Sequence, residues 1–266
     1  MTVFWRFVRD RRGAGLWWCV AAAGLVLFTV GFYSSIKGQQ DVDDLVQDLP
    51  AAVQALLGVQ DGIPLSSAPG YLHARLFSTL YVLLMVVLGI SAGSYAIGGS
   101  EEDGTLELLL ANPISRTRVI LERYGGVVFL MASVMAVFVG ALLLSAPVVD
   151  ALEGVSVGGL VAATLAGAAL ALLHASLAFA GGSATGRRTP GIALATAVAV
   201  SGYLAYGLFT AAEAPAFIRN LTPWEWYLRD NMLADGAAIL PIVLPLVVCA
   251  VLAGLSVSLF NRRDLH

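Results

Sequence analysis

Three groups of residues in this chain have types and spacing that could do chemistry. Glu101 and Glu102 form a carboxylate pair of the kind used in general acid–base catalysis. Ser91 lies at the centre of Gly89-Ile-Ser-Ala-Gly93, which fits the G-x-S-x-G pattern of serine hydrolases. His174 lies midway along an apolar run, where an ionisable side chain is a functional candidate by default. Each hypothesis depends on the element that holds the side chain.

The elements predicted around these residues favour packing over catalysis. A serine hydrolase needs a strand, a sharp turn and a helix to expose its nucleophile, whereas Ser91 lies inside one continuous apolar run. The residues from Gly89 to Gly93 also spell G-x-x-x-G, a spacing that lets two membrane helices approach closely. The same spacing recurs near the ends of a later apolar run, at Gly154–Gly158 and Gly182–Gly186. For His174 we expect a structural role, with a hydrogen bond to a neighbouring helix, because no predicted span offers it a carboxylate partner.

The composition is that of a membrane protein. Of the 266 residues, 58% are hydrophobic and 12% are charged, and the mean hydropathy is +0.82. A soluble domain carries about 25% charged residues, so this chain has too few to cover a surface that faces water. Cys19 and Cys249 both lie in apolar runs without the spacing of a zinc site or disulfide framework, and we expect them to be small buried hydrophobes.

Six apolar runs are each long enough for the roughly 20 residues that a transmembrane helix needs. They contain no Asp, Glu, Lys or Arg, and they cover Gly15–Ser34, Leu76–Gly99, Tyr124–Ala146, Gly158–Gly182, Gly191–Ala212 and Ala237–Phe260. The first run is longer than the apolar part of a signal peptide, so we expect it to be retained. The sequence therefore predicts an all-α membrane protein with six transmembrane helices in a single domain, residues 1–266.

The basic residues predict the orientation of these helices. With the N-terminus in the cytoplasm, 11 of the 15 Lys and Arg residues lie inside and the other four lie outside. The inner set is Arg6, Arg9, Arg11, Arg12, Arg116, Arg118, Arg123, Arg187, Arg188, Arg262 and Arg263. The outer set is Lys37, Arg75, Arg219 and Arg229. Both termini are therefore expected in the cytoplasm.

The first outer connection, Ser35–Arg75, is long and acidic. In it Val42, Leu45, Val46 and Leu49 fall at helical spacing, which predicts a short amphipathic helix at the outer surface. This connection is either a gate or cap over a substrate path or a solvated connector, and the sequence leaves both interpretations open.

Three other segments are expected to shape how the helices meet the membrane surface. The aromatic residues of Pro223-Trp-Glu-Trp-Tyr227 should anchor at the level of the lipid headgroups. Pro241 and Pro245 should kink the sixth helix near its outer end. The N-terminal segment Phe4–Arg12 mixes aromatic residues with arginines and should lie along the inner leaflet, close to anionic lipid.

The sequence offers no internal source of energy for transport. A P-loop needs G-x-x-x-x-G-K-[ST], and the only lysine, Lys37, stands between Ile36 and Gly38. Ion-coupled transporters and proton pumps generally carry buried carboxylates or charge pairs, and the six predicted spans contain none. Energy for uphill transport should therefore enter through a partner.

The segment Gly99–Arg116 gathers charge and leucine between two charge-free runs. After Gly104 breaks the chain direction, Thr105 is expected to cap a short helix by offering its hydroxyl to an unpaired amide. Leu106, Leu109 and Leu110 would form its apolar face. Asn112-Pro113 should end this helix and Ser115 should cap the next. We expect a docking element, with leucines toward the bilayer or other spans and carboxylates toward water; the alternative is an interfacial loop.

These residues resemble a known family signature. The run Glu101-Glu-x-Gly-Thr-Leu-x-Leu-Leu-Leu-x-x-Pro-x-Ser-Arg116 is similar to that of ABC transporter permease subunits of the second, export-class type. Six spans, inside termini, a long first outer loop and Arg262-Arg-Asp264 extend the likeness over the whole chain. In that family this segment is a coupling helix that docks on a separate ATP-hydrolysing subunit.

The resemblance assigns roles to particular residues. The positions that match the family pattern are Glu101, Glu102, Gly104, Thr105, Leu106, Pro113 and Arg116. It implies that Glu101 and Glu102 make polar contacts with the ATPase or with the basic N-terminal helix, and that Gly104 and Thr105 set the start of the coupling helix. Asp103, Glu107 and Asn112 occupy positions that the pattern leaves open.

The function that the resemblance implies is ATP-driven export across a bacterial or archaeal cytoplasmic membrane. This chain would have no catalytic, cofactor or metal site of its own, because ATP and Mg would bind to the partner ATPase. A second copy or a sister permease would complete the pore, membrane lipid would surround it, and no nucleic acid is involved. A path lined by small and apolar residues favours a lipophilic, drug-like or antibiotic-like cargo; its expected members are Ser133, Thr164, Ser176, Tyr203 and Tyr206. The rival functions are an intramembrane hydrolase that uses Ser91 or the Glu101–Glu102 pair, and a non-enzymatic membrane scaffold.

Overall fold

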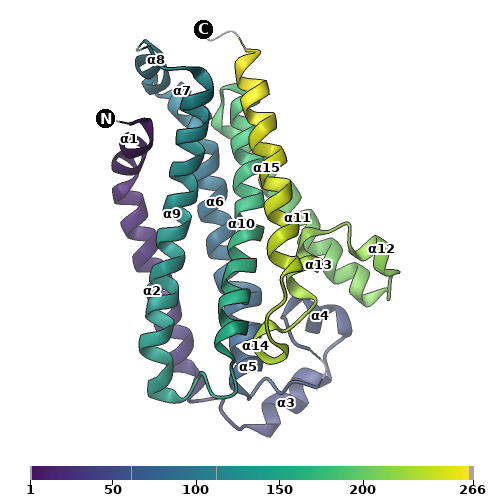
Figure 1. Ribbon diagram of the computed structural model, residues 1–266. Helices are drawn as coiled ribbons and strands as arrows, with labels where there is room; N and C mark the ends of the chain where they lie inside the picture. The colour runs from purple at the N-terminus through teal and green to yellow at the C-terminus, as the bar shows by residue number, and fades with distance from the viewer. Residues whose placement is uncertain (1, 61, 112, 264–266) are drawn as a thin grey trace.

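The protein is a bundle of long helices (Figure 1), seen in a computed structural model that describes residues 2–60, 62–111 and 113–263. The described residues are helical and contain no strand, and six helices are long and apolar enough to cross a membrane. The all-α prediction with six candidate spans is therefore confirmed. Their bounds are Arg12–Tyr33, Ala68–Glu102, Arg116–Val149, Val157–Thr185, Arg188–Ala211 and Leu240–Asn261.

Two of the six spans are built from more than one element. The first, fourth, fifth and sixth are α2 (Arg12–Tyr33), α10 (Val157–Thr185), α11 (Arg188–Ala211) and α15 (Leu240–Asn261). The second joins α5 (Ala68–Tyr71), the π-helix η1 (Leu72–Tyr81), α6 (Val82–Ser94), the π-helix η2 (Tyr95–Gly99) and α7 (Ser100–Glu102). The third joins α9 (Arg116–Ser145) to a 3-10 turn, η3 (Ala146–Val149).

Shorter helices lie at the two ends of the bundle and at its side (Figure 1). One end carries α1 (Val3–Asp10), α8 (Thr105–Leu110) and the last turn of α15, and we call it the termini end. The opposite end carries α3 (Gln40–Gln47), α4 (Ala51–Leu56) and α14 (Met232–Asp235). The helices α12 (Ala216–Arg219) and α13 (Pro223–Leu228) follow α11.

The second and fourth spans form the centre of the bundle. About two thirds of each apolar stretch is buried inside the protein, 67% and 72%, against 17–28% for the other four spans. At their contact, a Cβ on Gly89 would lie 2.9 Å from the carbonyl oxygen of Ala171, and a Cβ on Gly93 would overlap the carbonyl of Ala175. The predicted G-x-x-x-G packing is therefore confirmed at this position.

The other two glycine pairs behave differently. Gly154 lies before α10 with a φ of +74°, and Gly186 ends α10 with a φ of +70°, so both serve the left-handed turns that glycine favours. Within these pairs Gly182 packs closely, since a Cβ there would lie 3.2 Å from the backbone nitrogen of Gly98. The expectation that Gly154 and Gly186 pack against another helix was wrong. Both residues lie at or near the end of a helix, where glycine is needed for its positive φ and not for close contact with a neighbouring helix.

The second span begins about two helical turns earlier than expected. Ser67 accepts a hydrogen bond from the Gly70 amide at 3.2 Å and a proline lies in the first turn, so the helix starts at Ala68 rather than Leu76. Arg75 therefore lies within the helix and not in the connection before it. His73, which the prediction also placed outside the span, is buried in η1.

The aromatic segment after the fifth span is buried and does not anchor at the headgroups. Trp224 and Tyr227 are 5% and 2% exposed. The Trp224 indole donates to the Ala199 carbonyl at 3.0 Å, and the Tyr227 hydroxyl donates to the Phe77 carbonyl at 2.9 Å. The headgroup interpretation was wrong because α13 folds back among the spans. Beside them Glu225, 2% exposed, forms ion pairs with the flanking arginines Arg219 and Arg229 at 3.5 and 3.3 Å.

Three smaller expectations had mixed outcomes. The helix predicted around Val42–Leu49 exists as α3, and α4 follows it. Pro241 lies in the first turn of α15, where a helix tolerates proline, while Pro245 lies inside the helix. Cys249 is buried and Cys19 is half-buried, and both thiols are free.

Gly93→Ala should destabilise the bundle because the added methyl group overlaps the Ala175 carbonyl on the neighbouring helix. We expect a loss of about 1–3 kcal/mol, the usual cost of overpacking, measured as a lower midpoint of thermal unfolding in detergent. The matched control is Gly140→Ala on α9, where a Cβ meets nothing within 4 Å; it should be neutral or slightly stabilising. Equal midpoints for the two variants would contradict the packing described here.

Candidate functional site

The segment Gly99–Arg116 lies at the termini end of the bundle, where it joins the second span to the third (Figure 1). The π-helix η2 leads into α7, and the chain then turns at Gly104, whose φ is +68°. The Gly104 amide donates to the carbonyl of Glu101 at 3.0 Å, which closes this turn. Glycine adopts this left-handed conformation without steric cost, so Gly104 separates α7 from α8.

Thr105 does not cap α8, contrary to the prediction. Gly104 is the residue before the helix, and Thr105 is its first helical residue. The Thr105 hydroxyl donates instead to the Ser100 carbonyl at 3.0 Å, which ties α8 back to α7. The left-handed turn brings Thr105 into helical conformation one residue earlier than the pattern suggests, so its side chain reaches a carbonyl and not an amide.

The helix α8 has a buried face and an exposed face. Leu106 and Leu109 are 1% and 5% exposed and pack into the core, and Leu110 is half-buried. The predicted leucine face is therefore confirmed. Glu107 is exposed and Leu108 is 64% exposed, so these two residues form the exposed face of α8.

Glu101 forms an ion pair with Arg263, just beyond α15, at 2.6 Å. The two side chains are only 16% and 21% exposed, so water screens the pair weakly. Arg263 also donates to the Ser183 carbonyl at 3.0 Å, and its own carbonyl accepts from Arg116 at 2.7 Å. Two of the predicted site residues, Glu101 and Arg116, are thus brought together through Arg263, which links α7, α9, α10 and the end of α15.

Glu102 contacts the start of the fifth span. Its carboxylate accepts a hydrogen bond from the Arg188 amide, the first residue of α11, at 3.1 Å. A carboxylate at a helix N-terminus is stabilised by the unpaired amides and by the helix dipole. The two glutamates therefore contact the C-terminal side of the bundle, and not the basic N-terminal helix that the resemblance offered as one alternative.

The N-terminal helix reaches the segment through Tyr95 and Asp103. The Tyr95 hydroxyl donates to the Asp103 carboxylate at 3.0 Å, and the Arg11 guanidinium lies 4.3 Å from the centre of the Tyr95 ring. Burial lowers the pKa of Arg11, and the neighbouring Tyr95 partly opposes this shift. Asp103, which the family pattern leaves open, thus joins the segment to the junction of α1 and α2.

Arg123 was not singled out by the sequence as a site residue. It is 4% exposed, donates to the Ala96 carbonyl at 2.9 Å and also donates to the Ser100 hydroxyl. It therefore holds η2 and α7 against α9. Its only sequence signal was its place directly before the predicted third run, which is also where a topogenic arginine would stand.

The remaining residues of the segment lie near the start of α9. Ser115 caps this helix by accepting a hydrogen bond from the Arg118 amide at 3.3 Å, as predicted. Pro113 lies in the bend between α8 and α9, outside both helices. Asn112, expected to help end α8, lies outside the described residues.

The other chemical candidates lie in packed helices. Ser91 is in the interior of α6, so the strand and turn of a nucleophile elbow are replaced here by continuous helix. His174 is fully buried in α10, and its Nδ1 is 2.9 Å from the Leu170 carbonyl of the same helix. The expected bond to a neighbouring helix was wrong on this point; the ring lies 6.1 Å from that of Trp224 instead.

An apolar cavity of about 200 Å³ lies between the second and fifth spans. It is lined by Ser78, Thr79, Val82, Leu83, Val86, Ala199, Val200, Tyr203, Leu204 and Trp224. Among the residues expected to line a transport path, Tyr203 lines this cavity, whereas Thr164 lines a separate hollow between α9 and α10. The hydroxyls of Thr164 and Ser176 donate to carbonyls one turn back in α10.

Comparison with known families identifies the chain. Residues 1–265 match the family described as ABC-2 family transporter protein. The chain belongs to this family. Its members are membrane permease components of ABC transporters, and the ATPase of such a transporter is a separate subunit. A search of the curated proteins found no match. The resemblance deduced from the Glu101–Arg116 signature is thus confirmed at the level of the family.

The Glu101–Arg263 pair predicts a charge-reversal phenotype. Glu101→Arg should place two cations together and lower the stability by about 1–3 kcal/mol, between the values for exposed and buried ion pairs. Adding Arg263→Glu should restore at least half of the loss, measured as the midpoint of thermal unfolding in detergent. The control is Arg118→Glu, whose 60% exposed side chain pairs with Glu122 and leaves the Glu122–Phe4 hydrogen bond in place, so that an effect below about 0.5 kcal/mol is expected. Additive losses in the double variant would contradict the contact.

Proposed function

We propose that this ABC-2 permease exports a small lipophilic compound, and that its segment Gly99–Arg116 is the coupling element on which a separate ATPase docks. The termini end of the bundle is then cytoplasmic, in agreement with the 11 basic residues that the topology assigns to that side. The observation that carries the proposal is the attachment of this one short segment to α9, to α11 and to the end of α15.

These hydrogen bonds and the ion pair allow a displacement of α8 to be transmitted to several spans. Glu102 holds the first residue of α11, while Glu101 holds Arg263 beyond α15. Leu106 and Leu109 are buried in the core, so α8 cannot be displaced without moving its neighbours. A docked ATPase that changes shape on ATP binding would therefore move the second, fifth and sixth spans together. Alternative arrangements of packed helices are the usual basis of such switching.

The proposed contact surface is the exposed side of α8. Glu101, Glu102 and Thr105 bond to Arg263, to the start of α11 and to α7. On α8 itself Glu107 and Leu108 are exposed, Leu108 at 64%. We therefore assign the first three to holding the coupling element in position and the last two to direct contact with the ATPase.

The apolar cavity between the second and fifth spans supports a lipophilic cargo. Three of its lining residues, Leu83, Val200 and Leu204, are about half exposed on the apolar sides of their helices. The cavity thus opens sideways, so that a compound dissolved in the bilayer could enter it. Trp224 and Tyr203 supply the aromatic surface, with ring centres 4.9 Å apart.

A complete transporter requires other chains. The proposed assembly contains two ATPases, with ATP and Mg bound to them, and a second permease that is either another copy of this chain or a sister protein. Bacterial or archaeal cytoplasmic membrane is the proposed location. The reading frames adjacent to this gene are the first place to look for the ATPase.

Leu108→Glu should reduce capture of the co-expressed ATPase at least tenfold in a pull-down from detergent and should reduce ATP-driven dye uptake into inverted vesicles. The reason is that a carboxylate replaces the apolar contact at the centre of the exposed α8 surface. Phe217→Glu, in α12 outside the six candidate spans and 73% exposed, is the matched control and should leave capture unchanged. Normal capture and uptake with Leu108→Glu would count against docking at α8.

Replacing both Glu101 and Glu102 with Ala should have a different effect. These carboxylates hold α11 and Arg263, so their loss should leave ATPase capture within about twofold but should uncouple ATP hydrolysis from uptake. The ratio of compound transported to ATP hydrolysed checks this. An unchanged ratio would show that the two glutamates do not couple ATP hydrolysis to transport.

A further inference from the structure

The helix α4 lies at one edge of the apolar cavity. This edge faces the end of the bundle opposite the termini. The hydroxyl of Tyr203, a cavity residue, donates to the carbonyl of Leu56 at the end of α4, at 2.5 Å. One turn further along α11, a Cβ on Gly207 would lie 2.8 Å from Cγ of Leu56. Across the cavity, Gly58 lies directly against the side chain of Ser78, another lining residue. The end of α4 therefore spans the gap between the second and fifth spans.

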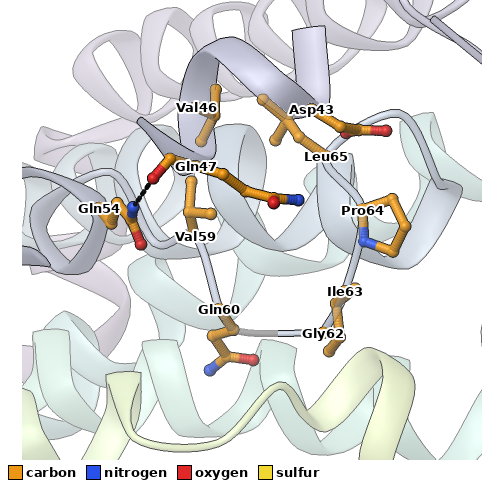
Figure 2. A pocket seen from close by; sticks show the side chains of 10 residues that line it. All are labelled: Asp43, Val46, Gln47, Gln54, Val59, Gln60, Gly62, Ile63, Pro64 and Leu65. Carbon is orange, nitrogen blue, oxygen red and sulfur yellow. Dashed lines mark hydrogen bonds between the residues drawn. The ribbon is translucent and has the colours of Figure 1, made fainter. Parts of the chain in front are cut away.

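Two further hollows adjoin this cavity at the α3–α4 segment, whose described residues are 40–60 and 62–65. The nearer one, about 140 Å³, shares Thr79 with the apolar cavity and is also lined by Leu57. The outer one, about 460 Å³, shares three residues with the nearer hollow: Val46, Val59 and Leu65. Figure 2 shows this outer hollow between α3 and the residues Val59, Gln60 and Gly62–Leu65. The three hollows form a row, and the end of α4 with its turn at Gly58 stands between the first and second.

The lining changes from apolar to polar along this row. The cavity between the spans is lined mainly by aliphatic and aromatic side chains. The middle hollow adds Arg75. The outermost hollow presents one carboxylate and three amides: Asp43, Gln47, Gln54 and Gln60 (Figure 2). Such a gradient suits a compound that leaves an apolar site for water.

The α3–α4 segment is a folded unit and not a solvated connector. The Gln54 amide donates to the carbonyls of Gln47 and Leu49 at 3.0 and 2.8 Å, which joins α4 to α3 (Figure 2). Asp43 accepts hydrogen bonds from the amide and the hydroxyl of Ser66 at 2.9 and 2.6 Å. The Gln54 bonds are internal to the segment, while the Asp43 bonds join α3 to Ser66 directly after it. The helices α3 and α4 can therefore move together when the Tyr203–Leu56 contact opens.

We propose that α4 and the turn at Gly58 form the outer gate of this permease, that Tyr203 and Gly207 are its seat on α11, and that cargo leaves through the row of hollows under α3. This proposal rests on the proposed export function, and it chooses the gate over the connector for the first connection. In the arrangement described here the gate is closed, since Leu56 covers Gly207 and Gly58 covers Ser78.

A disulfide across the seat tests the gate directly. In a Cys19→Ala/Cys249→Ala background, Leu56→Cys and Gly207→Cys place two Cβ atoms at most about 4.3 Å apart, one bond beyond the 2.8 Å contact and within disulfide range. With the partner ATPase in inverted vesicles, oxidation should lower ATP-driven uptake of a lipophilic dye at least tenfold, and reductant should restore it. The control pair is Gly158→Cys/Ala237→Cys, whose Cβ atoms would be 4.0 Å apart away from α4, and its oxidation should leave uptake unchanged.

The outcomes separate the gate from the export function. Uptake by the cysteine-free background tests export itself. A disulfide that forms at 56–207 without slowing uptake overturns the gate, and so does the failure of this disulfide to form, because it contradicts the contact. Loss of uptake in the control pair as well would also overturn it, since any outer cross-link would then suffice.

A second measurement needs no ATPase. Ser78→Cys in the same background reports access to the cavity from the outer side, through its labelling rate with a membrane-impermeant thiol reagent. Tyr203→Phe removes the hydrogen bond to Leu56 and should raise this rate at least threefold. Tyr71→Phe removes a comparable buried bond, from its hydroxyl to the Thr29 carbonyl at 3.0 Å, and should not. Equal labelling rates in the two variants would overturn the gate.

Discussion

The close approach of the second and fourth spans sets the position of almost everything else in this protein. At Gly89 and Gly93 the helix α6 comes so near to α10 that the carbonyls of Ala171 and Ala175 occupy the space where side chains would lie. Lipid tails are as apolar as leucine, so helices in a membrane associate by packing of this kind rather than by a hydrophobic driving force. The same seam continues to the termini end, where Gly98 lies against the backbone of Arg187. As a result, the segment after the second span emerges beside the connection between α10 and α11.

That position explains how charged residues are satisfied at the end of an apolar bundle. An unpaired charge in a low-dielectric surrounding is costly, and three charged side chains at the termini end have identifiable partners. Glu101 meets Arg263, Glu102 meets the first amide of α11, and Arg123 donates to Ala96 and Ser100. The helix α13 follows the same rule, because Glu225 lies between Arg219 and Arg229. The polar contacts at the termini end also make one mechanical unit of helices that are distant in sequence.

The expectations that failed share a physical cause. Trp224 and Tyr227 have the composition of a headgroup anchor, yet α13 folds inward, where their donors reach backbone carbonyls of α11 and η1. Thr105 is a residue type that often caps helices by accepting a hydrogen bond from an amide. Here it follows the left-handed turn at Gly104, and its hydroxyl donates to the Ser100 carbonyl instead. In both cases the residue type predicts a hydrogen bond correctly, and only the surrounding structure decides the partner. His174 is a third case, since its partner lies on its own helix.

The sequence by itself determined the class, the number of candidate spans and the family. A transmembrane helix is recognised from the mean hydropathy of about 20 consecutive residues. The Glu101–Arg116 signature is also a short continuous stretch, so neither prediction depends on contacts between distant parts of the chain. The cap at Ser115 and the buried leucines of α8 were predictable for the same reason. The tertiary structure alone decided that Arg263 pairs with Glu101, that Arg123 braces η2, and that α4 seats on Tyr203 and Gly207. These contacts join residues far apart in the chain, and their partners are selected by helix packing, which no short-range pattern records.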